Sequence, residues 1–239
     1  MSGHSKWSQI KRKKGLTDQK RGQIFSKMSR LITLSVKEGG GITDPEKNVK
    51  LRLAVTRAKS ENMPKENIDR AISKASGGES GSVQEVLYEG FGPSGVSLVI
   101  TGVTDNANRT HSEVKNLLEK NGGKIGTVGS VAYLFDKCGL IAFDKETTAE
   151  EAVFSFADKI NAIDIESTGD SYIVYIPFDK LGLVPTFTSG LEPTLVEPYY
   201  RPKSPILVPD KTKNSIERLI DLLEEHENID RVYDNLSED

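Results

Sequence analysis

The sequence has a single cysteine, Cys138, so no disulfide can form within the chain. This scarcity excludes the disulfide-stapled secreted domains and the zinc sites that are built from several thiolates. A chain with one thiol is typical of a reducing compartment, and we therefore expect a cytoplasmic protein.

Long apolar runs are also missing. No stretch approaches the roughly 20 apolar residues that a membrane-spanning helix needs, which excludes an integral helical membrane protein. The first residues lack the apolar core of a secretory signal, and we expect neither a signal nor a transit peptide. We accordingly expect no membrane partner.

Patterns that would indicate catalysis or metal binding are sparse. His4, His111 and His226 are far apart and have no Cys or His neighbour at metal-ligand spacing. The segment GFGPSG (90–95) matches the G-x-G-x-x-G pattern of nucleotide-binding loops. However, a predicted strand follows it where a helix is needed, so a hairpin turn explains it better. No motif indicates a nucleophile. We expect no metal, no cofactor and no catalytic residue.

What the sequence does contain is an ordinary folded composition with an uneven charge. With 36% hydrophobic and 28% charged residues, the 239-residue chain can form one large domain or two to three small ones. Residues 1–76 carry 18 Lys and Arg against 7 Asp and Glu, a net charge of +11, whereas residues 77–239 carry −14. The overall charge of −3 therefore conceals a basic N-terminal part and an acidic remainder.

Helical periodicity dominates the basic part. Residues 17–38 place their apolar side chains on one arc, and the glycine triplet 39–41 ends this predicted helix. Asp44 and Pro45 predict the N-cap and first position of a second helix, and Pro64 opens a third. Residues 76–82 have the composition of a linker. We expect a basic three-helix bundle over residues 1–78.

After the linker the pattern changes to strands. Strands are predicted over 82–90, 96–103 and 129–135, with a helix over 108–120. The elements that follow approximate the ferredoxin-like order β-α-β-β-α-β, although the second helix is poorly signalled near 179–191. The C-terminal helix and strand cannot stand alone and are expected to rejoin the first sheet. We predict an α+β fold: an N-terminal three-helix bundle plus two α+β domains, the ferredoxin-like one inserted in the other. The predicted domains are 1–78, 79–135 with 206–239, and the insertion 136–205.

The basic N-terminal segment is the strongest functional signal. Residues 1–30 carry nine Lys or Arg against one acid, and residues 11–14 are four consecutive cations. Most charge runs are solvated helix faces, but these charges have one sign and repel each other. Phosphates would neutralise that repulsion, and counterion release would supply free energy. The predicted nucleic-acid-binding residues are Lys6, Trp7, Lys11, Arg12, Lys13, Lys14, Lys20, Arg21, Lys27 and Arg30.

A second polar motif, TDNANRT (104–110), is interpreted first as a turn whose Asn or Asp side chain caps the following helix. The alternative is a loop that presents Arg109 to a partner.

Several segments together resemble the YebC family: GHSKW (3–7), KRGQIFSK (20–27), GGG (39–41), KLRLAV (50–55), NMPKENIDRAI (62–72), YEGFGPSGV (88–96), TDNANRT (104–110) and GSVAYLF (129–135). The likeness runs from Met1 to about Phe135, with a weaker echo at 219–235. Members are described as probable transcriptional regulators in bacteria, and related mitochondrial proteins as translational activators. The resemblance implies a three-domain, bacterial-type regulator that binds DNA; residues 136–205 carry no motif of the family.

Three functions stay open. The first is a non-enzymatic regulator that contacts the phosphates of DNA or of structured RNA, ribosomal RNA included, because the helices lack a cluster of side chains suited to base edges. Its acidic domains would then face a basic protein partner. The second is an enzyme that uses Glu85 or Glu89 in a cleft between the acidic domains. The third is an adaptor whose basic part docks an acidic protein. The sequence does not indicate the oligomeric state.

Overall fold

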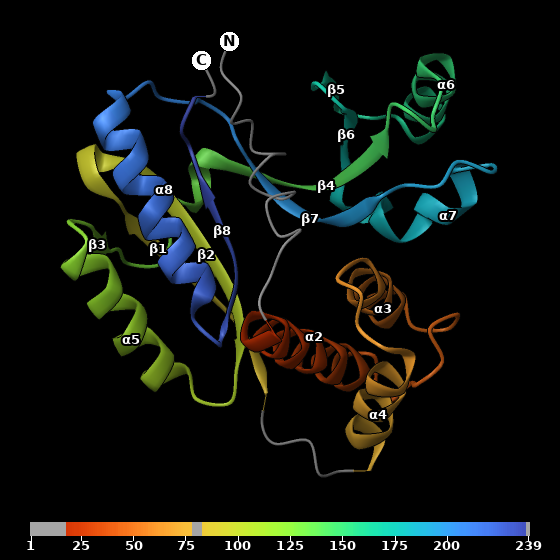
Figure 1. Ribbon diagram of the computed structural model, residues 1–239, viewed down its shortest axis with the longest axis horizontal. Coiled ribbons are helices and arrows are strands. Elements are labelled where there is room, and N and C mark those ends of the chain that lie inside the picture. The colour runs from red at the N-terminus through yellow and green to blue at the C-terminus, as the bar shows by residue number, and fades with distance from the viewer. Residues whose placement is uncertain (1–17, 78–82, 238–239) are drawn as a thin grey trace.

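The structure, a computed structural model, describes residues 18–77 and 83–237; for residues 18–20 only the backbone is described. Figure 1 shows three groups of elements arranged as a triangle: a helical bundle, a sheet backed by two long helices, and a second sheet with shorter helices. The predicted α+β class is confirmed.

The bundle consists of helices α2 (Asp18–Glu38), α3 (Val49–Ser60) and α4 (Lys65–Ser76). Met28, Ile32 and Val36 recur every four residues of α2, so they lie on one face and are buried against α3 and α4. After α2 the backbone turns left-handed at Gly40 and Gly41, with φ of 69° and 83°. The Gly41 N–H bonds to the Val36 carbonyl at 2.8 Å and so ends the helix. The predicted first and third helices are confirmed.

The predicted start of the second helix is wrong. Asp44 does not cap α3, because its carboxylate accepts a backbone N–H only two residues further on, at 3.0 Å, within a preceding turn. The N-cap is Asn48, whose side-chain oxygen accepts the Leu51 N–H at 3.1 Å. The Asn48 amide also donates to the carbonyls of Ser35 and Ile42, at 2.9 and 3.0 Å. These three hydrogen bonds fix Asn48 as the N-cap, although the Asp-Pro pair alone favours a helix start at Asp44.

The first sheet has the order β3-β1-β2-β8, and each neighbouring pair is antiparallel. Its strands are β1 (Gln84–Phe91), β2 (Ser97–Thr104), β3 (Lys124–Ile125) and β8 (Ile229–Asp234). Helices α5 (Ala107–Lys120) and α8 (Asp210–Glu225) cover one face, where Leu98 packs with Leu118 and Leu219 in a fully buried core. The C-terminal segment therefore rejoins this sheet through β8, as predicted. A 3₁₀ turn, η1 (Pro93–Gly95), joins β1 to β2, which confirms that GFGPSG belongs to a hairpin.

The second sheet has the order β5-β6-β4-β7, again antiparallel throughout. Its strands are β4 (Phe135–Asp144), β5 (Asp164–Ser167), β6 (Ser171–Pro177) and β7 (Leu195–Pro202). Helix α6 (Glu150–Ile160) joins β4 to β5, and two short helical turns, η3 (Phe178–Leu183) and α7 (Val184–Phe187), join β6 to β7. This arrangement is ferredoxin-like. The brevity of η3 and α7 explains why the second helix gave so weak a signal.

The predicted strand over 129–135 is wrong. These residues form a loop with a 3₁₀ turn, η2 (Ala132–Leu134), and β4 begins only at Phe135. The carboxylate of Glu89, on β1, accepts the backbone N–H groups of Gly129, Val131 and Ala132 at 2.5, 2.6 and 2.7 Å. Because these donors are occupied by a side chain, they do not serve a neighbouring strand. The apolar pattern reflects the burial of individual side chains of the loop.

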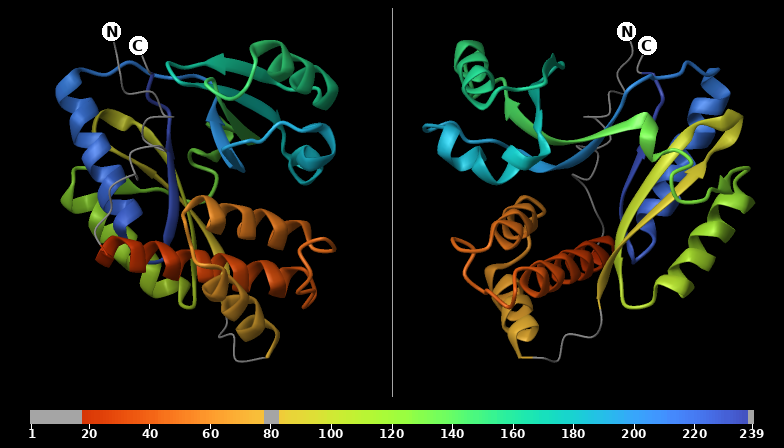
Figure 2. Two further views of the ribbon diagram at one scale, coloured as in Figure 1. Left: turned by 45° about the vertical axis from the view of Figure 1, so that its right-hand side comes forward. Right: turned by 180° about the vertical axis from the view of Figure 1, so that it is seen from behind.

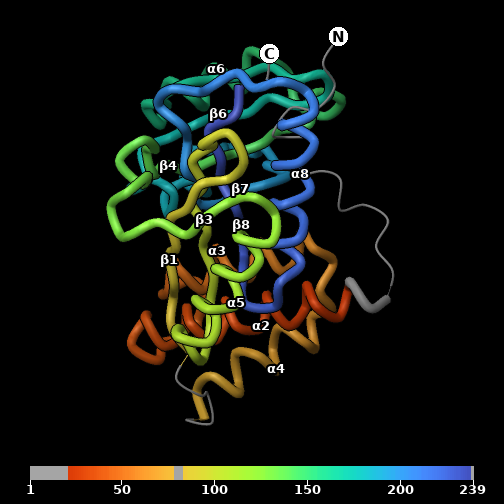
Figure 3. The backbone as a smooth tube through the Cα atoms, turned by 90° about the vertical axis from the view of Figure 1, so that its left-hand side faces the viewer, coloured from red at the N-terminus to blue at the C-terminus, as the bar shows by residue number. Residues whose placement is uncertain are grey.

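The two sheets meet along β4 and β7. Side chains from both sheets form one buried cluster there, which includes Val99, Cys138, Tyr199 and Tyr233. Figure 2 shows the bundle facing the second sheet and lying beside the first. Figure 3, seen from the side of the first sheet, has the second sheet at the top and the bundle at the bottom. The predicted domain boundaries themselves stay a prediction.

Candidate nucleic-acid interface

The predicted nucleic-acid-binding residues divide into two sets by position. Lys6, Trp7, Lys11, Arg12, Lys13 and Lys14 lie outside the described residues. Lys20, Arg21, Lys27 and Arg30 lie on α2, and the side chain of Lys20 is again outside the description. Arg21 is exposed, whereas Lys27 and Arg30 are half-buried. The surroundings of these last two side chains show what this side of α2 contacts.

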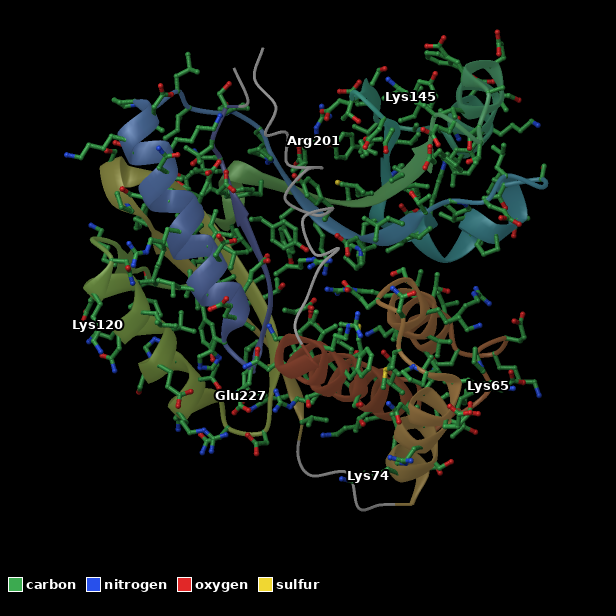
Figure 4. The ribbon with its side chains drawn as sticks, viewed as in Figure 1. Lys65, Lys74, Lys120, Lys145, Arg201 and Glu227 are labelled. Atoms are coloured by element: carbon green, nitrogen blue, oxygen red, sulfur yellow. The ribbon has the colours of Figure 1, made fainter. Side chains whose placement is uncertain are left out.

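Lys27 and Arg30 both contact the end of α8 and the segment that follows it, residues 224–228. The Lys27 ammonium donates to the carbonyl oxygen of Glu224. The Arg30 guanidinium donates to the Glu227 carbonyl and, at 2.9 Å, to Asn228 Oδ1. It also forms an ion pair with the Glu227 carboxylate at 3.3 Å. Figure 4 places Glu227 between the end of α8 and the beginning of α2. Sequence reasoning missed these partners, because each lies almost 200 positions away.

The TDNANRT motif holds this segment in place. The buried Asn228 donates its amide to Thr110 Oγ1 at 3.1 Å. Asn106 caps α5 by accepting the Arg109 N–H at 3.1 Å, which confirms the predicted cap. Arg109 itself forms an exposed ion pair with Asp105 at 2.8 Å. The motif therefore joins the start of α5 to the segment that contacts α2.

Buried charges join the bundle to both sheets. Arg57 of α3 makes two hydrogen bonds of 2.7 Å with the carboxylate of Asp230 on β8. Glu197 of β7 lies 3.6 Å from Arg57 Nε and 3.1 Å from the Arg231 guanidinium. Burial alone would lower the pKa of Arg57, but the carboxylates of Asp230 and Glu197 together outweigh burial, and the pKa is raised above its ordinary value. We call Arg57, Glu197, Asp230 and Arg231 the ion cluster; it holds α3, β7 and β8 together.

Further hydrogen bonds and apolar contacts join the bundle to the sheets. Lys37 of α2 donates to the carbonyl oxygen of Val83, just before β1, at 3.2 Å. Arg52 of α3 donates to the carbonyl oxygen of Gly182, next to the second sheet, at 3.1 Å. Apolar contacts are made by Leu31 and Leu34 toward the first sheet and by Leu53 toward the second. Arginine side chains therefore supply much of what fixes the bundle in position.

The outer side of the bundle carries cations that sequence reasoning did not select. Lys59 lies near the end of α3, and Lys65, Arg70 and Lys74 lie on α4. All four are exposed, and within the described residues none of their side chains makes a hydrogen bond or an ion pair. Figure 4 shows Lys65 at the end of the bundle that lies away from the first sheet, and Lys74 at the bottom edge of the bundle. On α4, the positions of Lys65, Arg70 and Lys74 between apolar residues were the signal that could have identified them.

The two carboxylates considered for an enzymatic site occupy different settings. Glu89 is 3% exposed, and its oxygens are directed at the loop they bind. Burial alone would raise the pKa of Glu89, but its three backbone N–H donors outweigh burial and lower the pKa below its ordinary value. Glu85 is exposed on the same strand. The pKa of Tyr200 is raised mainly by the burial of its own ring and, second, by the negative charge of Glu85. Glu89 therefore has the features of a structural anion.

Two absences hold for the described part of the chain. There, His, Cys, Asp and Glu side chains do not gather in threes in any arrangement that could hold a metal ion. No helix formed by these residues combines the length and the apolar character needed to cross a bilayer.

Known proteins match this chain over nearly its whole length. Two family models match: one for the TACO1/YebC protein N-terminal domain at residues 5–78, and one for the TACO1/YebC second and third domain at residues 83–236. A "probable transcriptional regulatory protein" of Methylacidiphilum infernorum is 43% identical over 239 residues, which cover 98% of this chain and 95% of that protein. A protein of the same name from Herpetosiphon aurantiacus is 42% identical, with coverage of 99% and 94%. The crystal structure of a conserved hypothetical protein from Aquifex aeolicus superposes with a TM-score of 0.87 at 35% identity, covering 98% of this chain and 97% of that one.

Proposed function

We propose a function for this chain, which belongs to the YebC family. It is a non-enzymatic regulator of gene expression and binds nucleic acid through its basic N-terminal part. Its relatives carry the name "probable transcriptional regulatory protein", which supports a regulatory role. We place its action in the cytoplasm, with no membrane partner.

The observation that carries this proposal is the charge division of the chain. Residues 1–76 have a net charge of +11, and the remainder has −14. Cations of one sign at such density repel each other, and a phosphate backbone relieves that repulsion while it releases counterions. The acidic sheets repel phosphates, so the nucleic acid would lie on the bundle side, and the sheets would face a basic protein partner.

The proposed contact residues are Lys6, Trp7, Lys11, Arg12, Lys13, Lys14, Lys20, Arg21, Lys27 and Arg30. The Lys and Arg side chains would neutralise phosphates, and Trp7 would stack on a base or sugar, which is worth about 1–3 kcal/mol where it occurs. Lys59, Lys65, Arg70 and Lys74 extend the same basic surface over the outer side of the bundle.

Structured RNA, and with it a role in translation, is the second candidate for the target. The exposed side of α4 carries Lys65, Arg70 and Lys74 next to Glu66 and Asp69, and its cations are spread along the helix and do not cluster at one place suited to base edges. Such a surface favours contacts to the sugar-phosphate backbone over base reading. Proteins that recognise folded RNA by its shape use contacts of this kind.

The test is the salt dependence of binding to a short DNA duplex and to an RNA hairpin. Replacing Lys11, Arg12, Lys13 and Lys14 by Ala should reduce the slope of log affinity against log salt by up to about 3–4, since each neutralised phosphate contributes roughly 0.9 on duplex DNA. The control replaces Lys120, Lys159, Lys211 and Lys213 of the acidic part and should leave the slope unchanged. An equal slope for wild type and the first variant would contradict the proposal for these residues.

The target itself is identified by crosslinking in cells, followed by sequencing of the attached nucleic acid. Promoter DNA would indicate transcription, and ribosomal RNA would indicate translation. Partners that copurify even after digestion of DNA and RNA would instead support a protein adaptor.

A further inference from the structure

Two of the cations proposed to meet phosphates are already in use within the chain. Lys27 donates to the Glu224 carbonyl, and Arg30 binds the carbonyl and carboxylate of Glu227 as well as the Asn228 amide. These acceptors are oxygens that a phosphate can replace, because phosphate accepts the same charge-assisted hydrogen bonds from Lys and Arg. The segment 224–228 therefore occupies part of the proposed binding surface.

This internal contact is accessible to solvent and weak. The side chain of Arg30 is 27% exposed and that of Glu227 is 62% exposed. Ion pairs this exposed contribute little to stability, because water screens them. A polyanion that brings several phosphates together can therefore compete with the segment for both cations.

The rest of the contact between bundle and sheets is also suited to release. Its apolar part is small, and polar interfaces between domains permit relative motion. The strongest element is the bidentate pair of Arg57 with Asp230, at 2.7 Å. Once the bundle moves away, both charges enter water, so separation does not leave an unpaired charge buried.

We propose that the described arrangement is autoinhibited: residues 224–230 mask Lys27, Arg30 and Arg57, and a nucleic acid that takes over the exposed cations releases the bundle from the first sheet. This inference depends on the proposed function. In the released state, Lys27 and Arg30 join the other cations of the N-terminal part as one continuous basic surface.

The test measures the separation of the bundle from the first sheet by energy transfer between two dyes. Cysteines replace Ser73 on α4 and Asn116 on α5, which are exposed and uncharged. Native Cys138 stays unlabelled, because it is buried and burial raises its thiol pKa to about 11. The probe is an RNA hairpin or a short DNA duplex at constant salt, and its binding is followed in parallel by anisotropy.

The expected result is that saturating probe lowers the transfer efficiency. Without probe, Asp230→Asn should already lower the efficiency and bind the probe several-fold more tightly than the matched control Glu119→Gln. Glu227→Gln, an exposed change that does not threaten folding, should act in the same direction to a smaller extent. Binding with unchanged transfer efficiency, and with equal affinities for all three variants, would overturn autoinhibition and leave the proposed function intact. Failure of both probes to bind would refute the proposed function, and the inference with it.

Discussion

The carboxylate of Glu89 accepts hydrogen bonds from three backbone N–H groups of the loop that follows β3. Here one carboxylate accepts backbone N–H groups that, in a sheet, would bond to the carbonyl oxygens of a neighbouring strand. The loop remains ordered while it presents Val128, which is 95% exposed, and Tyr133, which is 65% exposed. The buried negative charge of Glu89 is tolerated because its carboxylate oxygens accept three hydrogen bonds.

Replacing Glu89 by Gln should lower the free energy of unfolding by about 2–3 kcal/mol, because hydrogen bonds to a charged acceptor are stronger than neutral ones and an amide N–H would now oppose a backbone N–H. Urea unfolding measures this loss. The control, Glu85→Gln, is exposed on the same strand and should stay within about 0.5 kcal/mol of wild type. Equal losses of unfolding free energy for the two variants would show that the three hydrogen bonds do not stabilise the fold.

The same residue gives a pH dependence with a definite sign. The folded state holds the pKa of Glu89 below its ordinary value of 4.5, so folding favours the ionised form. Its contribution is therefore complete above that pH and is lost as the pH falls through the lower, folded-state pKa. The difference in unfolding free energy between wild type and Glu89→Gln should be constant near neutral pH and should narrow below about pH 4.5. A difference that grows on acidification would refute this account.

At the scale of elements, the start of α3 depends on contacts that span two helices. Asn48 is buried, caps α3 and donates to two carbonyls, one of them at the end of α2. The close approach is visible at Gly39, where a Cβ atom would lie 2.1 Å from Asn48 Nδ2. Only a residue without a side chain fits at that position beside this amide.

Asn48→Ala should therefore cost about 2–3 kcal/mol of stability, of which roughly 1 comes from the lost cap and the rest from two carbonyls that lose their donor. Asp44→Ala provides the control, because Asp44 precedes the helix and is exposed; its loss should be below about 1 kcal/mol. Thermal unfolding of both variants distinguishes the two positions. A larger loss of stability for Asp44→Ala than for Asn48→Ala would indicate that Asp44 is the more important cap.

These elements also show how far the sequence could be interpreted. Periodicity sufficed for α2, α4 and the strands of the second sheet, because their patterns reflect which face is buried. It failed at 129–135, where the apolar residues imitate a strand and Glu89, forty positions earlier, takes the donors. The capping preference of Asp-Pro failed at Asp44, because Asn48 is the N-cap and has a further partner on another helix. The partners of Lys27 and Arg30 could not be found, because charge counting along a chain carries no information about contacts between its two ends.

At the scale of the whole molecule, arginines of the bundle reach both sheets. Arg57 meets Asp230 and Glu197, and Arg52 meets the Gly182 carbonyl. The Nε atoms of Arg57 and Arg231 are buried and make no hydrogen bond among the described atoms. The two positive and two negative charges of the ion cluster balance each other, but not every buried donor in it is satisfied.

Arg57→Met should uncouple the bundle. Removing one partner of a buried pair costs about 3–5 kcal/mol if the other charge stays buried, and the molecule relieves that cost by releasing the bundle. Calorimetry should then show a separate unfolding transition at lower temperature. Arg52→Met, on the same helix, loses one bond to a carbonyl and should keep the wild-type profile with a loss of about 1 kcal/mol. Identical profiles for the two variants would contradict a special role for the ion cluster.

The order of elements along the chain gives β8 a particular place in assembly. This strand completes the first sheet and supplies Asp230 and Arg231, yet it is translated after every other described element. The helices of the bundle, by contrast, are translated before both sheets. For most of its synthesis the nascent polypeptide therefore displays Lys27, Arg30 and Arg57 without their later partners. Under the proposed function, the growing chain would therefore bind polyanions more readily than the finished protein, in which β8 and the segment before it provide partners for these cations.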